Sequence, residues 1–274
     1  MRPTVRRPSE VLSGLEVRTI GGLNALPRTE RRLAYCSLLP LDVLLRFDLD
    51  PEELTSPDAS DLWSIEPRAS SVALSLRHRA DAEDPLLFLQ LADTTTNQIE
   101  VVLFMVNDPT AQRFETDRLP DGTPTEFATV ARNIPEEIRA MEAGLAPGQV
   151  RRGLRLTRDL VPILERLVSA LSHDAFYLQP LAYHNAILFE RLGFAYALGL
   201  GRMEWIHREF GPGGLLRARL DGSTPFRRGD AWRTVRGRSW AIHDGIMDMP
   251  FAGIKMYKRV GVHSGVVTFP SAAW

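Results

Sequence analysis

The stretch Leu86-Leu-Phe-Leu-Gln-Leu-Ala-Asp-Thr-Thr-Thr-Asn-Gln-Ile-Glu-Val-Val-Leu-Phe-Met-Val106 contains two apolar runs joined by a short polar segment. The polar residues 93–98 have about the length that joins the strands of a hairpin. Upstream, Ser71-Val-Ala-Leu-Ser-Leu-Arg77 roughly alternates large apolar side chains with small or polar ones, as a half-buried strand does. We therefore expect three antiparallel strands between residues 71 and 106.

Helical patterns dominate the chain after these strands. Apolar residues at spacings of one, three and four predict a helix that packs on a core around residues 163–171. A further helical stretch should begin at residue 147 or 148, and Pro162 should divide it. Other expected elements are helices at 28–38, 135–144, 183–192 and 202–210, and short strands at 176–179 and 266–269. The fold class is therefore α+β, with early antiparallel strands, a mainly helical second half and a short additional strand or strands.

The composition is that of a globular protein, with 274 residues, 44% hydrophobic and 24% charged. Its net charge of -1 averages unlike segments, because residues 1–32 carry +4, residues 33–148 carry -13 and residues 149–274 carry +8. This asymmetry predicts a flexible arm at 1–10, an acidic strand-containing part at 11–148 and a basic, mainly helical part at 149–274. A single domain spanning 11–274 is the alternative.

Several classes of protein are disfavoured by what the sequence lacks. No apolar run reaches the roughly 18 residues that span a bilayer, and no apolar segment follows the basic N-terminus, so we expect neither a membrane protein nor a secretory signal. The single cysteine, Cys36, cannot form an internal disulfide, and a cytoplasmic location is expected. A pI near 6.6 argues against nucleic acid as a partner.

Residues suited to chemistry gather in the second half of the chain. The segment 149–274 holds five of six His, four of five Trp, four of five Tyr and 14 of 20 Gly. Histidine titrates near neutral pH, aromatic side chains offer contact area, and Gly lets the backbone approach a ligand. We therefore expect the functional site in this segment.

The most specific stretch in that segment is Phe176-Tyr-Leu-Gln-Pro-Leu-Ala-Tyr-His-Asn-Ala-Ile-Leu-Phe-Glu-Arg-Leu-Gly-Phe194. It resembles the closing part of the GNAT superfamily of acyl-CoA-dependent acetyltransferases, which has a strand, an Asn and a helix ending aromatic-Glu-Arg-Leu-Gly-Phe. The resemblance implies that residues 176–179 form a central strand splayed from a parallel neighbour. Two departures stand out: Gly153 is followed by Leu154 and Arg155 instead of the family's Gly-x-Gly or Gly-x-Ala, and Phe189 stands where many members have a catalytic Tyr.

This resemblance implies an acyltransferase that uses acetyl-CoA or another acyl-CoA and acts on a small amine or related acceptor. The coenzyme would be bound by residues in and near the loop before the helix at 163–171 and by one Asn, namely Arg151, Arg152, Gly153 and Asn185. Backbone N–H groups at a helix N-terminus suit the pyrophosphate of coenzyme A. Tyr183 would line the acceptor side, and Glu204 or His184 would remove the amine proton.

A metal site is the alternative enzymatic interpretation. Glu204-Trp-Ile-His207 places a carboxylate and an imidazole at i and i+3, which are adjacent on one helical face. Together with His184 and His243 they would form a His/carboxylate set for Fe or Zn. An alternative without a metal is an ion pair between Glu204 and Arg208, which lie at i and i+4 on the same helix.

The third interpretation is a non-catalytic binding protein. Residues 221–245 read as a long loop in which arginines alternate with Trp and small polar residues, including Arg233, Arg236, Arg238 and Trp240. Guanidinium groups bind phosphate or carboxylate, and Trp offers a stacking face, so a small anionic ligand or another anionic partner is expected. Ion pairing with the chain's own acidic segment is an equally good explanation.

Overall fold

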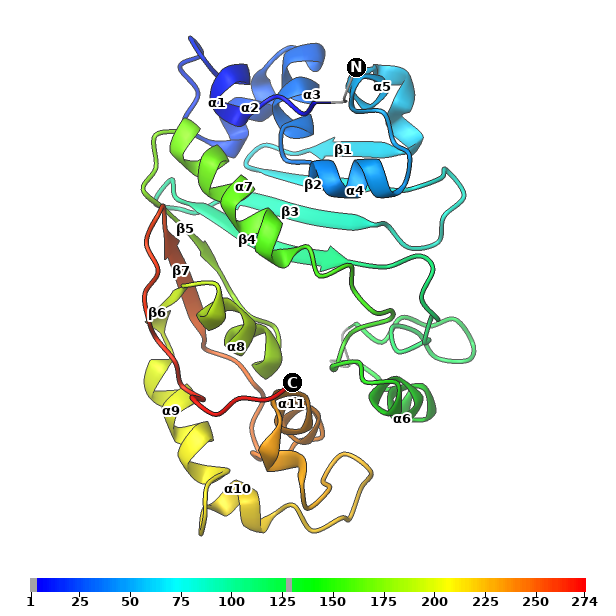
Figure 1. The fold of residues 1–274 in the computed structure, drawn as a ribbon, viewed down its shortest axis with the longest axis vertical. Helices are drawn as coiled ribbons and strands as arrows, with labels where there is room; N and C mark the ends of the chain where they lie inside the picture. The colour runs from blue at the N-terminus through cyan, green and yellow to red at the C-terminus, as the bar shows by residue number, and fades with distance from the viewer. Residues whose placement is uncertain (1–3, 127–129) are drawn as a thin grey trace. The chain divides into compact units, whose positions relative to one another are not determined.

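The computed structural model describes residues 4–126 and 130–274 (Figure 1). Strands lie mostly in the first half of the chain and helices mostly in the later half, and the sheet is mixed, so the predicted α+β class is confirmed. Within those ranges, no helix has both the length and the apolar character that crossing a membrane would require.

Two compact units divide the chain, and each is built from three segments. The first unit comprises Met1–Pro109, Gly153–Leu178 and Tyr257–His263, and the second comprises Thr110–Arg152, Gln179–Met256 and Ser264–Trp274. A single boundary at residues 148–149 therefore does not describe the division. The chain leaves the first unit at Pro109, returns at Gly153 and returns again near its end, which composition along the sequence does not reveal. The predicted arm contains a helical turn, α1 (Pro8–Val11).

A seven-stranded sheet runs through the described residues in the order β1-β2-β3-β4-β5-β7-β6. The strands are β1 (Trp63–Pro67), β2 (Ser71–Leu76), β3 (Leu87–Asp93), β4 (Ile99–Val106), β5 (Ala175–Leu178), β6 (Ala195–Leu198) and β7 (Lys255–Arg259). β1 to β4 are antiparallel neighbours, whereas β4 and β5 are parallel. The three strands predicted between residues 71 and 106 are all present, and so is the strand predicted at 176–179.

The antiparallel strands form where the side chains alternate. Buried and partly exposed residues take turns along β2 and through the first five residues of β3, as expected of strands with one face on a core. The amide of Thr94 donates to the carbonyl of Gln98 at 2.7 Å, which closes the predicted turn between β3 and β4. β1 was not predicted: its sequence Trp-Ser-Ile-Glu-Pro is short and ends in Pro, and pairing with β2 is what holds it in the sheet.

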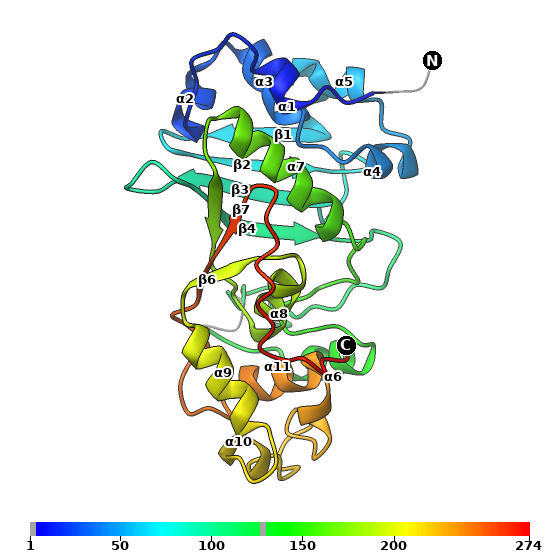
Figure 2. The ribbon, with the colours of Figure 1, turned by 60° about the vertical axis from the view of Figure 1, so that its left-hand side comes forward.

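Helices of the first unit cover this part of the sheet. They are α2 (Ile20–Ala25), α3 (Arg28–Cys36), α4 (Leu41–Arg46), α5 (Pro51–Thr55), the 3-10 helix η1 (Pro57–Asp61) and α7 (Thr157–Ala170). Thr19 caps α2 by accepting a hydrogen bond from the amide of Gly22. α7 passes in front of β3 and β4 in both views (Figures 1 and 2).

The boundaries of α7 correct two sequence predictions. The helix begins at Thr157 instead of residue 147 or 148, and Pro162 lies inside it without ending it. Six apolar side chains of α7 are buried: Leu160, Val161, Ile163, Leu164, Leu167 and Val168. Burial of a large apolar side chain contributes about 1.5–3 kcal/mol, so the packed face outweighs the roughly 3 kcal/mol that an interior proline costs.

The second unit contains the remaining helices. They are α6 (Ile134–Glu142), α8 (Tyr183–Arg191), α9 (Leu200–Glu209), α10 (Leu215–Ala218), the 3-10 helix η2 (Ala231–Arg233) and α11 (Val235–His243). Among the largest fully buried side chains of this unit are Tyr183, Phe194, Phe210, Phe226 and Trp240. Phe226 and Trp240 stack on each other, with ring centroids 5.2 Å apart.

Two further predictions in this unit were wrong. Residues 221–245 are not a structureless loop, because η2 and α11 lie within them and Thr234 caps α11 by accepting from the amide of Gly237 at 2.9 Å. The predicted strand at 266–269 is irregular, and the last strand is β7 instead. Thr268 in that irregular segment donates its amide and hydroxyl to the buried carboxylate of Glu190, which replaces strand pairing.

Candidate functional site

β4 and β5 are parallel neighbours that separate after a short paired region. Residues 99–101 of β4 pair with residues 176–178 of β5, and β5 ends at Leu178 while β4 continues to Val106. Figure 1 shows the two strands diverging from their shared end. Beyond residue 101, β4 is paired with β3 on its other edge.

A bulge in β4 marks the point of separation. Leu91 of β3 pairs with Val101, whereas its neighbour Gln90 pairs with Leu103, so Val102 is the extra residue. The side chain of Val102 is exposed, and residues 103–106 are partly exposed. A strand edge carries backbone donors and acceptors, and an extended ligand with amide groups can pair with such an edge.

The chain re-enters this unit at Gly153 and approaches the end of β4 closely. A Cβ at position 153 would lie 3.0 Å from the carbonyl oxygen of Val106, so a glycine permits the approach. Two residues later, Arg155 adopts φ +63°, a left-handed conformation that non-glycine residues rarely adopt. α7 then begins after Leu156, whose side chain makes no capping hydrogen bond.

The first turn of α7 is an electropositive helix end. Arg155 and Arg158 are exposed beside it, and Asp159 is the acid of that turn. Arg152, the exposed last residue of the second unit's segment, directly precedes Gly153 in the chain. Helix N-termini present N–H groups and a partial positive charge, which together bind anions. The loop and helix end therefore have the chemistry to hold a phosphate or pyrophosphate.

The residues predicted to bind the coenzyme occupy different positions. Gly153 and Arg152 lie beside the start of α7, whereas Arg151 donates to the carbonyl of Ala111 at 2.7 Å and so anchors the neighbouring segment. Asn185 is in the first turn of α8, in the other unit. The sequence missed Arg155, whose left-handed backbone conformation a sequence does not display and whose side chain is exposed beside the start of α7.

The predicted catalytic residues lie in three unlike environments. Tyr183 is buried, and its hydroxyl lies 3.5 Å from the guanidinium of Arg238; burial raises its pKa to about 12. His184 is buried against the hydroxyl of Ser239 at 2.9 Å, and burial lowers its pKa to about 3. Glu204 is exposed on α9. Tyr183 and His184 therefore behave as core residues, one protonated and the other neutral at pH 7.

The four residues of the predicted metal site are not gathered into a ligand set. Across residues 4–126 and 130–274, no group of three or more His, Cys, Asp or Glu side chains is arranged to hold a metal ion. Each imidazole has a different partner: His184 contacts Ser239, His207 contacts Arg238 at 3.2 Å, and His243 contacts Glu137 at 3.1 Å. The three imidazoles thus contact three different residues, and no common set of ligands for Fe or Zn is formed among the described residues.

The predicted anion-binding arginines hold α11 in place. Arg238 is 2% exposed, donates to the carbonyl of Trp232 at 2.7 Å and stacks 3.5 Å above the ring of Phe269. Trp240 is buried, stacks on Phe226 and donates its indole N–H to the carbonyl of Leu145 at 2.8 Å. Because both side chains are internal, they cannot form the exposed Arg/Trp loop that the sequence suggested.

The other two arginines of that set also contact aromatic rings. Arg233 lies over the ring of Trp232 at 5.3 Å, and Arg236 lies over that of Trp274 at 6.0 Å. Such cation–π contacts contribute about 0.5–1 kcal/mol at exposed sites. Contacts of this kind explain the arginine and tryptophan content of residues 221–245 without a ligand.

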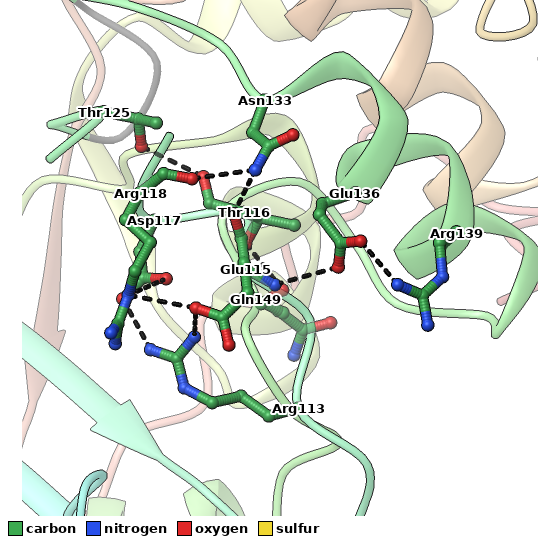
Figure 3. Close-up of polar contacts among 10 residues, drawn as sticks. All are labelled: Arg113, Glu115, Thr116, Asp117, Arg118, Thr125, Asn133, Glu136, Arg139 and Gln149. Carbon is green, nitrogen blue, oxygen red and sulfur yellow. Dashed lines mark hydrogen bonds and ion pairs between the residues drawn. The ribbon is translucent and has the colours of Figure 1, made fainter. Parts of the chain in front are cut away.

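A polar network that the sequence did not predict organises residues 113–149 of the second unit (Figure 3). The buried amide of Asn133 donates to the carbonyls of Glu115 at 3.0 Å and Arg118 at 2.8 Å. The hydroxyl of Thr125 donates to the carbonyl of Thr116, and that of Thr116 donates to the carbonyl of Gln149. These side-chain hydrogen bonds add to a few backbone bonds, such as that from the amide of Thr125 to the carbonyl of Asp117 at 2.9 Å, in holding the segment.

Ion pairs complete the network in Figure 3. The guanidinium of Arg113 contacts the carboxylates of Glu115 at 2.5 Å and Asp117 at 2.8 Å, and Arg139 contacts Glu136. Because these charges neutralise one another within the segment, the arrangement is typical of structural anchoring. It offers no excess charge for a substrate.

A second ionic cluster joins α6 to α11. Glu137 accepts from Arg132 at 2.5 Å and pairs with His243, and Arg132 reaches Asp244 at 3.2 Å. Burial alone would raise the pKa of Glu137, but the hydrogen bonds from His243 and Arg132 outweigh burial and lower it. Glu137 is therefore ionised at neutral pH and holds the two helices together.

Comparisons with protein-family models, with curated proteins and with solved structures found no match. The function must therefore be inferred from the residues and their geometry.

Proposed function

We propose that the chain is an acyl-CoA-dependent acyltransferase that acts on a small amine or related acceptor. The observation that carries the proposal is the separation of β4 from β5 next to the Gly153 loop that enters α7. This arrangement combines an open strand edge with an electropositive helix end in one compact unit.

The two features match two chemically different parts of an acyl-CoA. The pantetheine arm carries amide groups, which suit the edge of β4 at residues 103–106, past the bulge. The pyrophosphate suits the uncapped first turn of α7, where Arg152, Arg155 and Arg158 add positive charge. A single extended acyl-CoA molecule would contact both the edge of β4 and the first turn of α7.

The order of elements also supports the proposal. α7, β5 and α8 follow one another as the resemblance to GNAT acetyltransferases implies, and β5 is paired with a parallel neighbour from which it separates. The missing second glycine of the family's loop has a conformational counterpart, because Arg155 takes the left-handed backbone that glycine adopts most readily. At this one position the loop has the backbone conformation that a glycine would allow, although its sequence differs.

In such a reaction the acceptor amine attacks the thioester carbonyl carbon. A C–N bond forms, the C–S bond breaks, the thiol of coenzyme A leaves and the amine loses a proton. Holding both reactants in one site supplies much of the rate enhancement. Glu204, which the sequence predicts as a base, is exposed on α9 in the second unit, so it is not part of the arrangement of β4 and α7, and its role stays a prediction.

Release of free thiol from acetyl-CoA in the presence of a panel of primary amines tests the proposal. The wild-type protein should release thiol only when an accepted amine is present. A triple variant, Arg152→Gln/Arg155→Gln/Arg158→Gln, should raise the KM for acetyl-CoA at least tenfold, whereas Arg166→Gln on the exposed side of α7 should leave it unchanged. If the triple variant and Arg166→Gln behave alike, the helix end does not bind the coenzyme.

A further inference from the structure

A second cluster of arginines lies on α3, which is not part of the proposed acyl-CoA site. Arg28, Arg31 and Arg32 are spaced at i, i+3 and i+4, so they share one face of the helix. They line a pocket of about 110 Å³ together with Ser60, Ser64 and Ile65. That is several times the roughly 10–15 Å³ that one water molecule needs.

The side chain of Arg32 points to a missing partner. Arg32 is 5% exposed, and its Nε donates to the carbonyl of Leu54 at 2.8 Å. Its Nη2, which is also buried, has no hydrogen-bond partner in the part of the chain that the structure describes. Leaving a buried charged donor unpaired is costly in free energy, so this guanidinium has capacity for one more acceptor, which a water or a bound anion can supply.

The charge of the pocket is not balanced by protein carboxylates. Every charged residue in its lining is an arginine, and among the described residues no carboxylate forms an ion pair with any of the three. Burial lowers the pKa of Arg32, and the nearby positive charge of Arg28 acts in the same direction. An anion in the pocket would relieve both effects.

The remaining groups in the lining favour an anion with several oxygens. α3 begins at Arg28 without a side-chain cap, so its N-terminal end adds a partial positive charge. The hydroxyls of Ser60 and Ser64 can donate hydrogen bonds to oxygen. Three guanidinium groups and two hydroxyls exceed what one carboxylate can accept, whereas a tetrahedral phosphate presents enough oxygens.

We propose that the α3 pocket, defined by Arg28, Arg31, Arg32, Ser60, Ser64 and Ile65, binds a phosphate group, either free inorganic phosphate or a phosphomonoester. The guanidinium of Arg32, which lines the pocket, pairs with the phosphate. Arg28 and Arg31 supply the remaining positive charge; Arg31 also donates to the carbonyl of Asn24 at 2.8 Å, which fixes its side chain.

Calorimetric titration at constant ionic strength tests this site, with inorganic phosphate and glycerol 3-phosphate as the probes and chloride as the reference salt. Arg28→Gln removes an exposed charge and should leave the fold intact. It should weaken phosphate binding at least tenfold, and Arg28→Gln/Ser64→Ala should abolish it. The matched control Arg166→Gln, an equal loss of charge on an exposed face of α7, should bind as the wild type does.

The results separate the two sources of phosphate and the two proposed sites. Tighter binding of glycerol 3-phosphate identifies a phosphomonoester, and equal or weaker binding identifies free phosphate; either outcome supports the site. Arg155→Gln, in the loop before α7, should leave unchanged the phosphate binding that is lost in Arg28→Gln/Ser64→Ala, because Arg155 does not line the α3 pocket. The proposal is overturned if 10 mM phosphate produces no more effect than chloride, or if binding is lost in Arg155→Gln and kept in Arg28→Gln.

Discussion

Gly153 lies directly against the carbonyl oxygen of Val106, since a Cβ at position 153 would be 3.0 Å from that oxygen. The contact joins the end of β4 to the loop that leads into α7. Both features of the proposed acyl-CoA site, the open strand edge and the helix end, depend on this close approach.

Replacing that glycine tests the approach directly. Gly153→Ala should push the loop away from β4 and lower both the affinity for acetyl-CoA and the melting temperature. Gly201→Ala is the matched control, because position 201 is exposed in α9 with open space around it. Alanine there should raise the free energy of unfolding by about 0.5–1 kcal/mol. Equal effects of the two substitutions would show that the contact at Gly153 is unimportant.

Trp240 should be a main determinant of the stability of the second unit. Its indole N–H is the donor to the carbonyl of Leu145, and its ring stacks on Phe226. Trp240→Phe keeps an aromatic ring but leaves that carbonyl unpaired, so urea denaturation should show a loss of about 1–3 kcal/mol. Trp274→Phe, at a position 38% exposed, should change stability by no more than about 0.5 kcal/mol. Similar losses of stability in Trp240→Phe and Trp274→Phe would contradict a main role for Trp240 in the stability of the unit.

His184 should make stability depend on pH under acidic conditions. Burial lowers its pKa to about 3, below the ordinary value of 6.5, so the unfolded chain binds more protons between pH 3 and pH 6.5. The free energy of unfolding should therefore fall as pH drops through this window, by up to about 1.4 kcal/mol per pH unit from this residue. His184→Asn should flatten the profile relative to the wild type, whereas His263→Asn, at an exposed position, should not. If the free energy of unfolding depends on pH in the same way in the wild type and in His184→Asn, His184 does not cause the loss of stability in acid.

The network in Figure 3 should control local order in residues 113–126. Asn133→Ala removes two hydrogen bonds to backbone carbonyls, and unpaired buried acceptors cost about 1–3 kcal/mol each. Amide hydrogen exchange should become faster in this segment while β2 and β3 stay protected. The exposed control Glu142→Ala should leave exchange unchanged. Unaltered exchange in Asn133→Ala would mean that the segment is held by other contacts.

The sequence predicted the parts of the fold in which local pattern and tertiary packing agree. Alternation along residues 71–76 and the polar turn before Ile99 were enough to identify β2, β3 and β4. Prediction from the sequence failed where tertiary contacts determine the secondary structure. Nothing local ends the helical pattern before Thr157, yet the approach of Gly153 to β4 and the left-handed Arg155 require a loop there.

For the candidate site residues, too, the sequence shows the chemistry of each side chain but not its tertiary contacts. Tyr183, His184, Arg238 and Trp240 have the chemistry of functional groups, but their burial depends on contacts across distant segments that a sequence does not display. The bulge at Val102 likewise appears only when β4 is paired with β3. The α3 pocket was not predicted from the sequence, because its two serines come from a part of the chain separate from the three arginines of α3.

Calorimetric titration of the wild-type protein with acetyl-CoA is the most direct test of the proposed function. We expect saturable one-to-one binding that is at least tenfold weaker in Arg152→Gln/Arg155→Gln/Arg158→Gln and unchanged in Arg166→Gln. A ligand at 100 times its dissociation constant should also stabilise the fold by about 2.7 kcal/mol. The absence of binding at millimolar acetyl-CoA would contradict the assignment of this chain as an acyl-CoA-dependent acyltransferase.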